Sequence, residues 1–64
     1  MNQEIIAMAT RAFEEGNHGH LKNIRDRVDA LFDQAPTPGV LALLREVDDL
    51  LSQLRRDRAE ARRA

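Results

Sequence analysis

Two histidines carry the strongest suggestion of chemistry in this sequence. His18 and His20 are two residues apart and follow the carboxylates Glu14 and Glu15. Imidazole and carboxylate groups bind zinc and nickel, so this stretch could ligate a metal. A single His-x-His pair lacks a second ligand pair at a fixed spacing, and the neighbouring glycines are explained by one helix ending and the next beginning. We therefore expect no metal site and no cofactor.

Acid–base and nucleophilic chemistry have less support. Asp48 and Asp49 are adjacent, and neighbours in a helix diverge by about 100°, so they do not form a working pair of carboxylates. The single serine, Ser52, lies among leucines and charged residues, and the sequence contains no glycine-rich phosphate loop and no Gly-x-Ser-x-Gly. We expect a protein that is not an enzyme and has no small-molecule substrate.

Arginine is concentrated at the C-terminal end of the chain. Residues 1–54 carry five basic and nine acidic side chains, whereas residues 55–64 carry five arginines and two acidic residues. Guanidinium groups suit contacts with phosphate or carboxylate, but cations near a helix C-terminus also complement the helix dipole, and the tail has no aromatic residue to stack on bases. Nucleic-acid binding is therefore the second hypothesis. Its candidate contacts to phosphate or an acidic partner are Arg55, Arg56, Arg58, Arg62 and Arg63.

The elements that must position these residues are helices. Alanine, leucine, glutamate and arginine dominate the sequence, and residues that favour strands are few. Turn-forming residues at 16–19 and 35–39 divide the chain into helices over about 3–15, 20–34 and 38–54 and onward. We expect one all-α domain over 1–54, followed by 55–64 as an arginine-rich helical extension or a frayed tail.

The third predicted helix has the widest apolar face, with two heptad-like seams that share Val47 and Leu54. It is also longer than the second helix. We therefore expect a short leading helix plus an antiparallel helical hairpin with a long C-terminal helix, which dimerises as a small helical bundle. The alternative is a monomeric three-helix bundle in which the leading helix covers the second seam. The residues expected to face the core or a partner are Val40, Leu43, Leu44, Val47, Leu50, Leu51, Leu54, Leu31 and Phe32.

One part of the chain resembles a known family. Val28–Asp33, followed by Pro36-Thr37-Pro38 and Leu41–Asp48, is similar to the helix, Pro-x-Pro linker and helix of NepR-type anti-sigma factors. Those proteins clamp a sigma factor with both helices, so the resemblance implies a hairpin that holds a protein partner. The linker is shorter here, and Asp29 stands where that family tends to have arginine. The resemblance illustrates a mode of action for such a hairpin.

The remaining features point to a cytoplasmic interaction protein. The sequence has no cysteine, the first residues lack the pattern of a signal peptide, and no apolar run approaches the roughly 20 residues that span a bilayer. A chain of 64 residues buries little surface on its own, which favours association. We expect a small regulator, inhibitor or adaptor that binds another protein or itself, most simply as a homodimer, through the apolar face of its hairpin, without a membrane.

Overall fold

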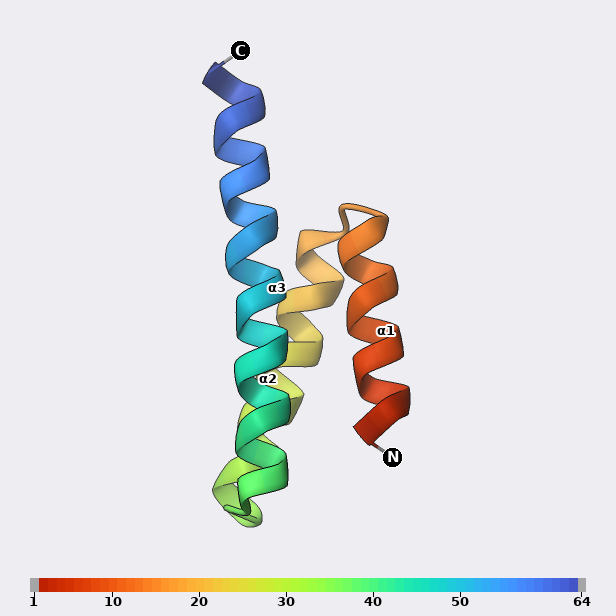
Figure 1. The fold of residues 1–64 in the computed structure, drawn as a ribbon, viewed down its shortest axis with the longest axis vertical. Coiled ribbons are helices and arrows are strands. Elements are labelled where there is room, and N and C mark those ends of the chain that lie inside the picture. The colour runs from red at the N-terminus through yellow and green to blue at the C-terminus, as the bar shows by residue number, and fades with distance from the viewer. Residues whose placement is uncertain (1, 64) are drawn as a thin grey trace.

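Three helices and their short connections make up residues 2–63, the part of the chain described by the structure, which is a computed structural model. The helices are α1 (Asn2–Glu14), α2 (His18–Gln34) and α3 (Pro38–Arg63), and no strand occurs among the described residues. The prediction of an all-α fold is confirmed. The molecule is elongated, measuring 42 × 17 × 15 Å, because α3 is longer than its two neighbours (Figure 1).

The end of α1 is fixed by Gly16. Its φ of 69° lies in the left-handed region, which glycine adopts without steric cost. The N–H of Gly16 donates to the carbonyl of Phe13 at 3.0 Å, and the N–H of Asn17 donates to the carbonyl of Ala12 at 2.9 Å. These two bonds form the Schellman motif, which satisfies the last carbonyls of the helix. The glycine stop expected from the sequence is therefore present.

The starts of α2 and α3 are each capped by a side chain. The Asn17 Oδ1 accepts a hydrogen bond from the His20 N–H at 3.1 Å, and the Thr37 Oγ1 accepts one from the Val40 N–H at 3.2 Å. Pro38 is the first residue of α3, where its missing N–H costs nothing. Because Asn17 is the cap, α2 begins at His18, two residues before the predicted start, and both histidines lie in its first turn.

Substitution of the cap of α2 tests this boundary. We expect Asn17→Ala to lower the free energy of unfolding by about 1 kcal/mol, because the His20 N–H loses its acceptor. Asn23→Ala is the matched control, since Asn23 is an exposed asparagine inside the same helix. Urea denaturation followed by circular dichroism measures both. Equal losses in the two variants would mean that Asn17 does not cap the helix.

The core forms where all three helices meet. Its largest fully buried side chains are Leu21 and Val28 of α2 and Val47 of α3. From α1 the buried contribution is two alanines, Ala9 and Ala12, which are 0% and 2% exposed. Small side chains at these positions let α1 pack closely against both α2 and α3. All three helices therefore contribute to one core, with α1 packed against both α2 and α3.

The register of α2 against α3 is marked by two side-chain pairs. Arg25 Nε donates to Asp48 Oδ1 at 2.9 Å, and Arg55 Nε donates to His18 Nε2 at 3.2 Å. Later residues of α2 therefore lie beside earlier residues of α3. Since His18 is the first residue of α2, residues 56–63 extend about 12 Å beyond it at 1.5 Å per residue. Figure 1 shows this free end of α3 standing clear of both other helices.

Candidate functional site

The nine apolar residues predicted to face the core or a partner fall into two groups. Four of them, Leu43, Val47, Leu51 and Leu54, are buried in the chain's own core. The other five are half-buried. Two of these, Leu44 and Leu50, pack against the core from its edges. The remaining three are Leu31, Phe32 and Val40.

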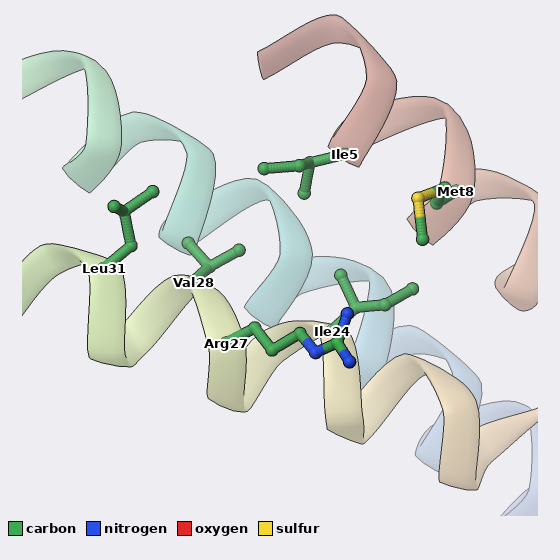
Figure 2. A pocket seen from close by; sticks show the side chains of 6 residues that line it. All are labelled: Ile5, Met8, Ile24, Arg27, Val28 and Leu31. Carbon is green, nitrogen blue, oxygen red and sulfur yellow. The ribbon is translucent and has the colours of Figure 1, made fainter. Parts of the chain in front are cut away.

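An apolar groove opens between α1 and α2, and its volume is about 320 Å³. Figure 2 shows Ile5 and Met8 on α1 across from Ile24, Val28 and Leu31 on α2. Met8 is 46% exposed and is the large hydrophobic side chain left in solvent among the described residues. Ile24 and Val28 at its floor belong to the core and are 4% and 2% exposed, whereas Ile5 and Leu31 are half-buried, so the accessible apolar surface of the groove comes from Ile5, Met8 and Leu31.

One charged residue, Arg27, completes the lining of the groove. Its side chain extends along α2 beside Ile24 (Figure 2). Arg27 is exposed and makes no ion pair within residues 2–63. Glu4, one helical turn before Met8, is also exposed and makes no ion pair with another described residue. The groove thus combines apolar walls with a free cation at its rim and a free carboxylate on the neighbouring helix.

Polar side chains line one edge of the contact between α2 and α3, whose centre is the apolar core. Here a cleft of about 180 Å³ is lined by Lys22, Arg25, Asp48, Leu51, Ser52 and Arg55. The pKa of the Arg25 guanidinium is raised above its ordinary value, chiefly by its hydrogen bond to Asp48 and then by the charge of that carboxylate. The ion pair between Arg25 and Asp48 joins α2 to α3 and so helps to fix their register, whereas Asp26 pairs with Arg25 within α2.

The C-terminal arginines occupy different faces of α3. Arg55, Arg58 and Arg62 line a second basic cleft of about 210 Å³ together with His18 and Ala59. Arg56 is exposed and is not part of that lining. The side chain of Arg63 lies outside the described residues, although its backbone is the last residue of α3. The extension predicted as helical or frayed is helical in the structure as far as Arg63.

The histidines and aspartates considered above as possible metal ligands or acid–base groups do not gather in one place among the described residues. Across residues 2–63, no group of three or more His, Cys, Asp or Glu side chains is arranged to hold a metal ion. The Nε2 of His18 accepts a hydrogen bond from Arg55, and His20 is exposed. Asp48 is bound to Arg25, whereas Asp49 is exposed.

Sequence reasoning missed most of the groove. Of its lining residues, only Leu31 belongs to the set predicted to face the core or a partner. The signal that could have found them is the spacing of Ile24, Arg27, Val28 and Leu31, which places a cation within an apolar stripe of α2. The spacing does not reveal that α1 stops short of covering this stripe.

Comparisons with protein-family models, curated proteins and solved structures find no match to this chain. None of the helices in residues 2–63 combines the length and the apolar character that crossing a bilayer requires.

Proposed function

We propose that this protein is a non-catalytic interaction module, a small regulator, inhibitor or adaptor, that binds an apolar helical segment of a protein in the groove between α1 and α2. The observation that carries the proposal is the groove itself, which has five apolar lining residues, one of which, Met8, is exposed. The apolar surface is exposed on a chain whose core is otherwise closed by three helices.

The occupant of the groove in the free protein is a second copy of the chain. Each copy offers an apolar groove with Arg27 at its rim and, on α1, the exposed Met8 with Glu4 one turn away. A two-fold arrangement inserts Met8 of each copy into the groove of the other and brings Glu4 toward the opposite Arg27. Such a contact satisfies both charges and is self-complementary, as a two-fold interface must be.

Such a dimer needs a contact wider than the groove alone. Stable interfaces bury at least about 600 Å² per partner, which is roughly one-eighth of the 4794 Å² accessible surface of the chain. The proposed contact extends from the lining residue Leu31 to Phe32, the next residue of α2, and both are half-buried. The leucines that were expected to form the interface are mostly occupied in the core, so the proposed contact moves from α3 to α1 and α2.

Sedimentation equilibrium tests the proposal directly. We expect the wild-type chain to be a dimer at micromolar concentration and Met8→Glu to be a monomer, because a carboxylate in the apolar groove loses its hydration without gaining a partner. Ala7→Glu is the matched control, since Ala7 is an exposed neighbour on α1 that does not line the groove. We expect it to remain dimeric.

Circular dichroism separates loss of association from loss of fold. Both variants are expected to keep the helix content of the wild-type chain, because Met8 and Ala7 are exposed on the surface of α1. A wild-type chain that is monomeric and folded at micromolar concentration would show the proposed self-association to be wrong. The same conclusion follows if Ala7→Glu dissociates as readily as Met8→Glu.

A partner other than the chain itself is expected to use the same groove. Affinity capture is carried out in parallel with the wild-type chain and with Met8→Glu, and the sets of proteins captured by the two chains are compared. A protein bound by the first and lost with the second supports the proposal. Identical recovery with both chains would assign the interaction to another surface.

A further inference from the structure

The second feature that the core does not explain is the basic cleft that begins at His18 and Arg55 and runs along α3 to Arg62. We propose that this cleft binds backbone phosphates of a nucleic-acid duplex through Arg55, Arg58 and Arg62. Its volume of about 210 Å³ and its lining by these arginines, His18 and Ala59 define the site. Ala59 supplies the only short side chain in the lining, which leaves room between the guanidinium groups.

The charges of the α3 extension are separated between two faces. Arg58 and Arg62 lie within about 60° of Arg55 around the helix axis at 100° per residue. The two acidic residues, Asp57 and Glu60, lie about 160° and about 140° away from Arg55, on the opposite side of the helix. Asp57 also accepts a hydrogen bond from Gln53 at 3.0 Å within its own helix. The cleft therefore presents cations without a carboxylate among its lining residues.

The helix dipole does not account for this separation. Cations near the C-terminus of α3 complement its dipole from any face, so the dipole does not favour the face toward His18. The cleft is also bounded by the first residue of α2, where the helix dipole is positive. Two independent sources of positive potential thus meet at the cleft.

His18 positions one of the arginines. Its Nε2 accepts the Nε–H of Arg55 at 3.2 Å, which leaves the two terminal nitrogens of that guanidinium without a hydrogen-bond partner among residues 2–63. Guanidinium groups bind phosphate through two parallel N–H donors. Arg55 is therefore held with its donors available for an anion in the cleft.

The shape of the extension favours a duplex as the ligand. The three arginines span about 10 Å along one straight helix, and duplex DNA presents a rigid row of charges, one per about 1.7 Å of its axis. The end of α3 stands clear of α1 and α2, so an elongated surface can approach it (Figure 1). No Phe, Tyr or Trp lines the cleft, and the imidazole of His18 is hydrogen-bonded to Arg55, so the expected contacts are to phosphates and independent of sequence.

Fluorescence anisotropy of a labelled short duplex of mixed sequence, titrated with the full chain, tests the inference. We expect binding at low salt, with log K falling against log salt at a slope of about −3, because each arginine that neutralises a phosphate contributes about −0.9. Arg58→Ala and Arg62→Ala are each expected to reduce the magnitude of the slope by about 1 and to weaken binding.

Arg56→Ala is the matched control, because it removes the same charge from the same helix at a position outside the cleft. It is expected to keep the wild-type slope. Failure of the wild-type chain to bind at low salt would overturn the inference, as would an equal loss of slope in Arg56→Ala. A polyglutamate peptide that binds the chain more tightly than the duplex would assign the cleft to an acidic protein instead. Variants that lose duplex binding are expected to keep self-association through the apolar groove, since the two sites share no residue.

Discussion

Leu21→Ala is expected to remove a large part of the stability of this chain. Leu21 is 0% exposed and is one of the largest fully buried side chains. Shortening a buried leucine to alanine costs about 2–5 kcal/mol, through lost apolar contact and the cavity left behind. A chain of 64 residues has a total stability of about 3–10 kcal/mol. The variant is therefore expected to be marginally folded at room temperature.

The matched control is Leu41→Ala. Leu41 is half-buried and does not belong to the buried cluster at the centre of the molecule. We expect this variant to lose less than about 1 kcal/mol. Urea denaturation monitored by circular dichroism gives both values. If the two leucines cost the same, the core is not organised around the start of α2.

A second large effect is expected from Ala9→Leu. Ala9 is fully buried where α1 packs on the other helices. Adding three carbon atoms at a closely packed position forces side chains and backbone to shift, which costs about 1–3 kcal/mol. We expect α1 to be displaced from the surface of α3, so that the apolar side chains beneath it become accessible to solvent.

Ala7→Leu provides the control for this effect, since Ala7 is exposed on the same helix. Leucine and alanine both favour helix, so this variant is expected to keep the stability of the wild-type chain. Hydrogen exchange followed by NMR reports on α1 separately. Unchanged protection of the α1 amides in Ala9→Leu would contradict close packing of this helix over the core.

The helices and their ends could be predicted well because their signals are local. Pro38 after Thr37 marks the start of α3, and Gly16 marks the end of α1 through a backbone conformation that other residues rarely adopt. The start of α2 was placed two residues late because His18 and Gly19 are poor helix formers. The Asn17 cap satisfies an N–H of the first turn and offsets their low propensity.

The role of α1 could not be predicted in the same way. The buried residues of α1 are Ala9 and Ala12. Alanine is only weakly hydrophobic, so a stripe of alanines does not stand out as a core-facing side of a helix in the sequence. Alanines at a helix contact act by permitting close approach, which depends on the shape of the neighbouring helices. For the same reason the sequence indicated more surplus apolar surface on α3 than the structure leaves.

The two candidate sites were predictable to different degrees. The spacing of Arg55, Arg58 and Arg62 on one face is visible in the sequence, because helical periodicity fixes it. The contribution of His18 is not, since it lies 37 residues before Arg55 and is brought there by the packing of α2 on α3. The apolar groove depends on where the first turns of α1 lie against α2, which is a property of tertiary packing alone.

An isotope-filtered NOE experiment tests the central claim most directly. It uses a dimer formed from equal amounts of labelled and unlabelled chain, and it detects contacts between copies only. The proposed function predicts intermolecular NOEs from the methyl group of Met8 to the methyl groups of Ile24, Val28 and Leu31. A mixed dimer whose intermolecular NOEs come only from α3, or a sample without any, would contradict an apolar groove that binds a second copy.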